Sequence, residues 1–319
     1  MISKDLRDAI EELQSDNIIG LPTETVYGLA GNAYSDKAIK KIYALKQRPL
    51  YNPLIVHIKS ANFLSEVAID IPAKAQILAE AFWPGPMTLV LRKKNLIPDI
   101  VTAGKDTVAV RVPSHSMALD ILRRLDFPLA APSANPFGSI SPTSASHVLD
   151  YFKDDLNVIL DGGECEKGIE STIIGFEKDE PIIYRLGSLS VDLIQDKVGP
   201  IMTRTHNGED APEAPGMLSR HYAPSTETYL TEDVDAMIAL HSQRKIGLLL
   251  FRDNNESVPL EQQEVLSMSG DVTEAAHNLY AAMHRLDKLD LDVIIAQRLP
   301  ALGLGTTLND KLERASKKA

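Results

Sequence analysis

Side chains suited to an anionic ligand are concentrated in a few short segments of this 319-residue chain. The segment PTETVYGL brings two hydroxyls and a phenol into one tight turn, and LKQRP holds Lys46 and Arg48 with one residue between them. Arg111 stands between valines in VAVRVPS, an expected core strand, where a buried guanidinium needs an anionic partner. Polar residues at turns and strand ends are well placed to contact ligands. The pattern indicates an anion-binding site.

Three further segments carry candidate residues. PLIVHI ends in His57, APSANPFGSISPT contains Ser133, Asn135, Ser141 and Thr143, and DGGECEKGIESTI joins a glycine turn to Ser171 and Thr172. Taken singly, each has an ordinary structural explanation. Cations at a helix C-terminus offset the helix dipole, Ser and Asn beside proline form turns, and a histidine next to an apolar strand is commonly structural. The residues alone leave both interpretations open.

Several familiar chemistries lack their sequence signatures. The chain contains no GxxxxGK[ST], GxGxxG or GxSxG motif, so a P-loop, a dinucleotide fold and a serine hydrolase are all disfavoured. Cys165 is the only cysteine, and the eight histidines show no HExxH spacing. We therefore expect no disulfide and no dedicated transition-metal site. Any metal should arrive with the substrate.

The charge distribution narrows the possible partners. The formal net charge is −11, which argues against a protein that coats nucleic acid through a broad basic face. Residues 37–59 nevertheless contain six basic side chains and no acidic one. The charged N-terminus lacks a secretory apolar stretch, and no apolar run approaches the roughly 20 residues needed to cross a bilayer. We expect a soluble cytoplasmic protein with a local anion site and no membrane contact.

Alternating helical and strand patterns must position these residues. Leu6, Ile10 and Leu13 share a helical face, and Ser35 can cap a second helix that Pro49 ends, which puts both cations of LKQRP at a helix C-terminus. Helices fit 72–82 and 117–125. Strands are expected at 18–21, 53–58, 87–93, 108–114, 128–134, 157–163, 171–176 and 181–187. Too little chain separates the last four strands for a helix between every pair, so the sheet should be mixed.

Residues 200–224 are rich in Pro, Gly and polar residues and lack periodicity, which predicts a domain boundary. We therefore divide the chain into a first domain at 1–199, a linker at 200–224 and a second domain at 225–319. The second domain shows strands at 226–230, 246–251, 264–268 and 292–298 and helices at 232–243, 272–288 and 305–316. This alternation predicts a small Rossmann-like α/β domain with helices on both faces of a largely parallel sheet.

The order of the motifs resembles a known family. PTETVYGLAG, LKQRPLYNPLIVHI, FWPGPMTLVL, VAVRVPSH, APSANPFGSISPT, GIESTI and RLGS resemble the YrdC-like domain of threonylcarbamoyl-adenylate synthases over about residues 1–190. APGMLSRHYAP and the small α/β domain resemble the long, two-domain form of that family. The resemblance implies a twisted mixed-sheet domain with a large concave, cationic cavity. It also implies an enzyme that joins L-threonine, bicarbonate and ATP into threonylcarbamoyl-AMP.

The resemblance further implies roles for individual residues. It makes Lys46 and Arg48 catalytic through charge neutralisation, and Mg²⁺ is expected to travel with ATP. The residues similar to ATP-binding ones are Arg48, Asn52, Thr107, Ser133, Asn135, Ser141, Arg185 and Tyr222. Those similar to threonine-binding ones are Thr25, His57, Arg111 and Ser171. In the two-domain form the segment with Arg220, His221 and Tyr222 is expected to close over the site as a lid.

The product implied by the family serves tRNA modification, so a downstream threonylcarbamoyl-transfer enzyme and weak tRNA binding are expected partners. Two alternatives compete with this interpretation. A non-catalytic RNA-binding module would also use a basic cavity, although the acidic net charge and the lack of an aromatic RNA-stacking motif disfavour it. A carbamoyl-phosphate-dependent relative, as in hydrogenase maturation, is expected to carry zinc-binding cysteines that one cysteine cannot supply.

Overall fold

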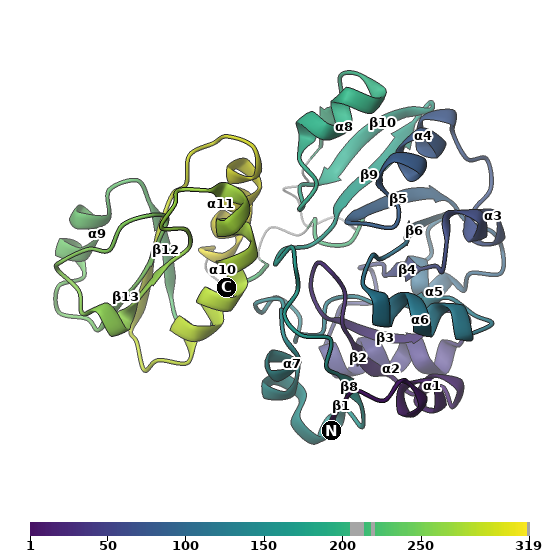
Figure 1. The fold of residues 1–319 in the computed structure, drawn as a ribbon, viewed down its shortest axis with the longest axis horizontal. Coiled ribbons are helices and arrows are strands. Elements are labelled where there is room, and N and C mark those ends of the chain that lie inside the picture. Colours follow the sequence, from purple (N-terminus) through teal and green to yellow (C-terminus); the bar gives the residue numbers. More distant parts are fainter. Residues whose placement is uncertain (205–213, 218–220, 318–319) are drawn as a thin grey trace.

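The computed structural model describes residues 1–204, 214–217 and 221–317, and these form a large lobe and a small lobe (Figure 1). The large lobe contains an 11-stranded sheet in the described residues. Its strands, in spatial order, are β1 (Ile2–Ser3), β8 (Ile159–Leu160), β2 (Ile19–Leu21), β3 (Gly28–Asn32), β7 (Leu129–Ala130), β4 (Ile55–His57), β6 (Thr107–Arg111), β5 (Met87–Arg92), β9 (Thr172–Glu177), β10 (Glu180–Arg185) and β11 (Met202–Thr203).

Both pairing directions occur in this sheet, which confirms the predicted mixed topology. The β2–β3 and β5–β6 pairs are antiparallel, whereas the β4–β6 and β5–β9 pairs are parallel. The helices of the lobe are α1 (Leu6–Gln14), α2 (Asp36–Lys46), α3 (Leu64–Val67), α4 (Ala73–Phe82), α5 (Asp99–Thr102), α6 (Ser116–Arg124), α7 (Ala145–Phe152) and α8 (Val191–Val198), with 3₁₀ turns η1 (Ala61–Phe63) and η2 (Lys153–Asp155).

Helix α2 shows how local sequence delivers cations to one place. The Ser35 side chain accepts a hydrogen bond from the Ala38 amide and starts the helix, as predicted. Gln47 adopts a left-handed conformation with φ 52°, which stops the helix directly after Lys46. The chain then turns back, and the Arg48 amide bonds to the Tyr43 carbonyl. Lys46 and Arg48 therefore leave the end of α2 in different directions.

The small lobe has the predicted three layers. Its sheet is parallel throughout, in the order β12 (Thr228–Thr231), β15 (Val293–Gln297), β13 (Ile246–Leu250) and β14 (Gln263–Val265). Its helices are α9 (Val234–Leu240), α10 (Val272–Asp287) and α11 (Leu304–Ala315), and η3 (Leu260–Gln262) is a 3₁₀ turn. Figure 1 shows α9 on one face and α10 and α11 on the face toward the large lobe.

Strand periodicity explains these layers. Leu248, Leu250 and Ile295 pack with residues of α9, whereas Leu249 and Ile294 pack with residues of α10 and α11. Successive side chains of a strand point to opposite faces, so both faces of the sheet are covered. Among the described helices, none is long and apolar enough to cross a membrane.

The predicted linker is more structured than its composition suggests. Met202 and Thr203 form β11, which pairs in parallel with β10, although the sequence predicted no periodic structure at 200–224. Only two residues pair, which is too short a run to give a periodic pattern. Arg220, one of the residues of the expected lid, lies outside the described residues.

Candidate active site

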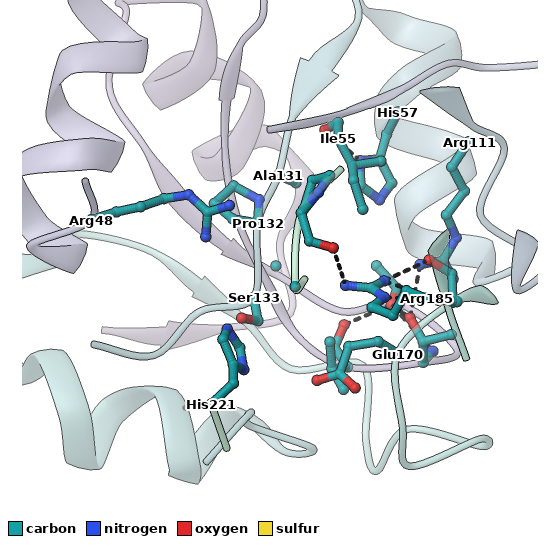
Figure 2. A pocket seen from close by; sticks show the side chains of 17 residues that line it. Arg48, Ile55, His57, Arg111, Ala131, Pro132, Ser133, Glu170, Arg185 and His221 are labelled. Carbon is teal, nitrogen blue, oxygen red and sulfur yellow. Dashed lines mark hydrogen bonds between the residues drawn. The ribbon is translucent and has the colours of Figure 1, made fainter. Parts of the chain in front are cut away.

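A cavity opens where the turn between β2 and β3, the end of α2 and the ends of β4, β6 and β10 converge (Figure 2). Its volume is about 40 Å³, enough for only a few water-sized molecules. Residues from eight separate segments line it, including Thr23, Thr25, Arg48, His57, Arg111, Ser133, Glu170, Ser171, Arg185, Pro215, Gly216 and His221. The last three belong to the predicted linker, which therefore contributes part of the wall.

Seven of the residues singled out in the sequence line this cavity: Thr25, Arg48, His57, Arg111, Ser133, Ser171 and Arg185. Five others lie behind the wall and contact residues of it: Lys46, Asn52, Asn135, Ser141 and Tyr222. Thr107 is not brought to this cavity. It lies at the start of β6, at the opposite end of the strand from Arg111, and lines a different depression with Asp106 and Tyr184. Its role in ATP binding stays a prediction.

Strand pairing places His57 next to Arg111. These residues end β4 and β6 and are direct partners in the parallel register, so their side chains lie on the same face of the sheet. Burial, aided by the nearby Arg111 charge, lowers the pKa of His57 to about 3. The imidazole is therefore neutral at physiological pH. It can accept or donate one hydrogen bond but brings no positive charge to the site.

Arg111 has the anionic partner that its burial required, and the partner is Glu24. The Arg111 Nη2 donates to Glu24 Oε1 at 2.6 Å, and both side chains are less than 5% exposed. Nη1 donates to the Thr25 hydroxyl at 2.8 Å, and Nε donates to the Gly85 carbonyl at 3.3 Å. Burial alone would raise the pKa of Glu24, but Arg111 outweighs it and the pKa is lowered.

This pair was only half predicted. The sequence indicated that Arg111 needs an anion, but it did not identify Glu24, which lies between Thr23 and Thr25 in PTETVYGL. A guanidinium offers five N–H donors, and Arg111 makes three hydrogen bonds to the described residues. Two N–H groups thus remain for a ligand carboxylate, which is consistent with the threonine-binding role expected for this residue.

Two arginines stand on different sides of the cavity (Figure 2). Arg48 donates to the Asn52 carbonyl at 3.0 Å, to Asn52 Oδ1 at 2.6 Å and to the Pro53 carbonyl at 2.8 Å. Arg185 donates from Nε and Nη2 to the Ser171 carbonyl at 3.1 and 2.9 Å. Burial lowers the pKa of Arg48 to about 10, so it is still charged at neutral pH. Neither arginine forms an ion pair in the described residues, which leaves both charges available to an anion.

Lys46 occupies a different position from the one expected of a phosphate ligand. Its Nζ donates to the carbonyls of Ser133 and Asn135, the latter at 2.5 Å, and the side chain is 1% exposed. The ammonium group therefore holds the APSAN loop (residues 131–135) from the side away from the cavity, and Lys46 does not line the cavity. Burial, together with the Arg48 charge, lowers the pKa of Lys46 well below its usual value.

Among the residues predicted to contact ATP, three have a buried polar atom near the wall that lacks a hydrogen-bond partner in the described part of the chain. They are Asn52 Nδ2, Asn135 Oδ1 and Tyr222 Oη. Buried polar atoms in native proteins are nearly always hydrogen-bonded, so these unpaired atoms are available to a ligand or a water. All three residues were predicted to contact ATP. Ser141, which belongs to the same predicted group, instead donates to Glu170 Oε1 at 2.6 Å.

Gly216 brings the linker close to Arg185. Its φ is +80°, a conformation that favours glycine, and a Cβ built there would lie 2.9 Å from Arg185 Cδ and Nη1. The same Cβ would be 3.4 Å from Tyr222 Oη. The backbone of the linker can therefore pack on the guanidinium only because this residue has no side chain. Composition alone predicts only a connector for this segment, whereas APGMLSRHYAP also carries part of the resemblance to the two-domain form.

Glu170 is the second functional carboxylate that the sequence did not reveal. It lies in GIESTI, lines the cavity and is 5% exposed. Burial would raise its pKa, but Lys311 and Arg185 outweigh burial and hold the pKa at about 2. The local sequence gives no indication of a role for Glu170, because its principal partner, Lys311, belongs to the second lobe, far along the chain.

The geometry is thus a buried, cationic cavity bounded by the large lobe and the predicted linker. Comparison with known proteins assigns the chain to a family. Residues 11–187 match the family model described as "Telomere recombination", and residues 188–317 match "Threonylcarbamoyl-AMP synthase, C-terminal domain". The threonylcarbamoyl-AMP synthase of Pyrococcus abyssi is 40% identical over 98% of this chain and 94% of its own. The chain belongs to the threonylcarbamoyl-AMP synthase family.

Other relatives support this membership. The threonylcarbamoyl-AMP synthase of Bacillus subtilis is 35% identical, with 95% of this chain and 90% of its own covered. The structure of P. abyssi Sua5 complexed with L-threonine superposes with a TM-score of 0.91 at 38% identity, and covers 98% of this chain and 94% of that one. The family and the two-domain α/β fold inferred from the ordered motifs are therefore confirmed.

Proposed function

We propose that this threonylcarbamoyl-AMP synthase family member is a nucleotidyltransferase that forms threonylcarbamoyl-AMP and pyrophosphate from L-threonine, bicarbonate and ATP. The observation that carries the proposal is the separation of two kinds of cation in one cavity. Arg111 is held among hydrogen-bonding residues at the strand ends, whereas Arg48 and Arg185 approach from different sides without ion-pair partners in the described residues. The first arrangement suits an amino-acid carboxylate, and the second suits a triphosphate.

The threonine end of the cavity is defined by Arg111, Thr25, His57 and Ser171. The two free N–H groups of Arg111 bind the carboxylate. The neutral His57 and the Ser171 hydroxyl offer uncharged hydrogen-bonding groups to the amine and the hydroxyl of threonine. A pocket that hydrogen-bonds a hydroxyl rejects an isostere that lacks it, because polar groups are left unpaired. Valine should therefore be a poor substrate.

The chemistry requires no side-chain nucleophile. The neutral amine nitrogen of threonine forms a bond to the carbon of bicarbonate while the C–OH bond breaks. The hydroxide takes one amine proton and leaves as water, which gives a carbamate. A carbamate oxygen then attacks the α-phosphorus of ATP, and the bond to the bridging oxygen of pyrophosphate breaks. Positioning and neutralisation of phosphate charge supply most of the catalysis in such transfers. Arg48 and Arg185 carry that role, and Lys46 holds the loop that faces the nucleotide.

Magnesium fits this site as a companion of the triphosphate, where it supplies charge neutralisation. The cavity carboxylate Glu170 is already engaged by Lys311, and Glu24 behind the wall is engaged by Arg111. These carboxylates are therefore unsuited to form a protein cage. Mg²⁺ commonly binds substrate phosphates and retains several waters, which agrees with such a donor set.

Part of the cavity wall comes from the predicted linker, through Pro215, Gly216 and His221. This segment is held by hydrogen bonds from Arg185 and Arg314, and the adjacent Ala214 and Met217 pack against strand residues of the large lobe. We propose that this segment is the lid expected from the sequence. Closure would shield a hydrolysable adenylate from water.

Pyrophosphate release tests the proposed function. Release should require ATP, L-threonine and bicarbonate together, and substitution of valine for threonine should lower the rate by roughly 10⁴-fold. Release at the same rate with valine would contradict the threonine assignment. A chain that binds tRNA tightly but releases no pyrophosphate would instead support the RNA-binding alternative. The adenylate itself would pass to a downstream enzyme that transfers the threonylcarbamoyl group to tRNA.

A further inference from the structure

A buried ion pair connects the second lobe to the catalytic cavity. Lys311 of α11 places its Nζ 2.7 Å from Glu170 Oε2, and the two side chains are 1% and 7% exposed. Tyr280 of α10 donates its hydroxyl to the same carboxylate oxygen at 2.8 Å. Both helices lie on the face of the small lobe that points to the large lobe (Figure 1). The second lobe thus supplies two of the groups that hold a carboxylate of the cavity.

The same ammonium group also contacts the linker. Lys311 Nζ lies 4.4 Å from the centroid of the Tyr222 ring, a cation–π distance, and the Tyr222 ring stacks on Tyr280 at 5.7 Å. On the adjacent turn of α11, Arg314 Nη1 donates to the Gly216 carbonyl at 2.5 Å. Lys311 is therefore at the junction of the cavity, the linker and the second lobe.

The charge of Glu170 matters because this cavity must accept a polyanion. Glu170 lines the cavity beside Arg185 (Figure 2), and its pKa of about 2 keeps it ionised at any physiological pH. Two cations act on this carboxylate, Lys311 and Arg185. Without Lys311 the carboxylate would face the cavity with Arg185 as its remaining counter-charge. An ionised carboxylate close to a triphosphate repels it strongly in a site of low dielectric.

We infer that Lys311 is a positioning residue of the active site, through which the second lobe neutralises Glu170 and so leaves Arg185 free to bind the phosphates of ATP. It acts on the substrate through Glu170 and Arg185 and does not itself line the cavity. The second lobe is then an electrostatic component of the nucleotide site as well as an attachment for the linker. This inference rests on the proposed function only in taking ATP as the polyanion.

Charge-neutral substitutions in the full chain test the inference. Lys311→Met should raise KM for ATP by roughly tenfold or more, because Glu170 is left uncompensated. The double variant Glu170→Gln/Lys311→Met removes both charges and should return KM for ATP to within about threefold of wild type. Lys288→Met is the matched control. Lys288 pairs with Asp150 across the same two lobes at 2.6 Å, but both side chains are about half exposed, so KM should not change.

Each outcome decides the question. A purely structural role for Lys311 predicts that the double variant is at least as impaired as Lys311→Met, and that result would overturn the inference. If Lys311→Met does not fold, the double variant alone tests the inference. A tenfold rise in its KM for ATP would contradict the proposed neutralisation of Glu170 by Lys311, and a near-normal KM would support it. Direct ATP titration separates the two proposals. Wild type that fails to bind ATP refutes the proposed function, whereas equal binding by wild type and Lys311→Met refutes only this inference.

Discussion

Substitution of Glu24 by glutamine tests how the buried arginine at the threonine end is maintained. Glutamine preserves the shape of Glu24 and one acceptor oxygen but removes the charge opposite Arg111. Both side chains are less than 5% exposed, so the guanidinium would be left uncompensated in the protein interior. Breaking a buried pair from one side costs about 3–5 kcal/mol, a large share of the 5–15 kcal/mol that stabilises a typical protein. We expect the melting temperature to fall by at least about 5 °C.

The pH dependence of this effect follows from the lowered pKa of Glu24. A carboxylate with a lowered folded-state pKa contributes stability that is present above its unfolded pKa of about 4.3 and is lost as pH falls through the folded value. The difference in melting temperature between wild type and Glu24→Gln should therefore be constant near neutral pH and shrink in acid. Differential scanning calorimetry between pH 3 and 8 measures it.

A surface pair provides the control for this prediction. Glu180→Gln breaks the contact with Lys74, which is 2.5 Å long but partly exposed on both sides, and should change the melting temperature by about 2 °C or less. Saturating L-threonine should stabilise Glu24→Gln more than wild type, because the ligand carboxylate replaces the missing charge. A Glu24→Gln variant that melts together with wild type would refute the assignment of Glu24 as the essential counter-charge of Arg111.

Three further predictions separate catalytic from structural roles. Arg48→Ala should lower the rate of pyrophosphate release by roughly 10²-fold or more and leave the melting temperature unchanged. Lys46→Ala should chiefly lower the melting temperature. Identical behaviour of the two variants would contradict this division of roles. Gly216→Ala should weaken ATP binding in calorimetric titrations, because its Cβ intrudes on Arg185; unchanged affinity would contradict it. His57, with its lowered pKa of about 3, contributes stability that is lost as pH falls below about 6.5, so His57→Asn should flatten the urea-unfolding free energy between pH 4 and 7.

Local signals in the sequence predicted much of the fold. The cap at Ser35, the end of α2 and the alternation of strands and helices after residue 225 depend on neighbouring residues, and the structure has them close to their predicted bounds. Strand β11 was missed because a two-residue pairing leaves no periodic pattern. The position of Thr107, remote from the cavity, was equally beyond local reasoning, because a strand pattern does not tell which end faces a ligand.

The cavity was predicted less completely, since its charges are paired over long distances. Arg111 was identified from its burial, but its partner Glu24 stands 87 residues earlier in the chain. Glu170 was missed altogether because its counter-charge, Lys311, lies in another domain. Lys46 was expected to neutralise phosphate charge, and only the packing shows that it donates to the carbonyls of Ser133 and Asn135. Composition and spacing identify charged residues, and tertiary contacts decide what each charge does.

Identification of the adenylate product tests the central claim most directly. The full chain should be incubated with ATP, L-threonine and ¹³C-labelled bicarbonate. The nucleotide products should then be separated rapidly and their masses measured by mass spectrometry. The account predicts an AMP conjugate that contains both the threonine residue and one labelled carbon, formed together with one pyrophosphate. An AMP conjugate of threonine that lacks the labelled carbon, or pyrophosphate release without any such conjugate in freshly quenched samples, would contradict it.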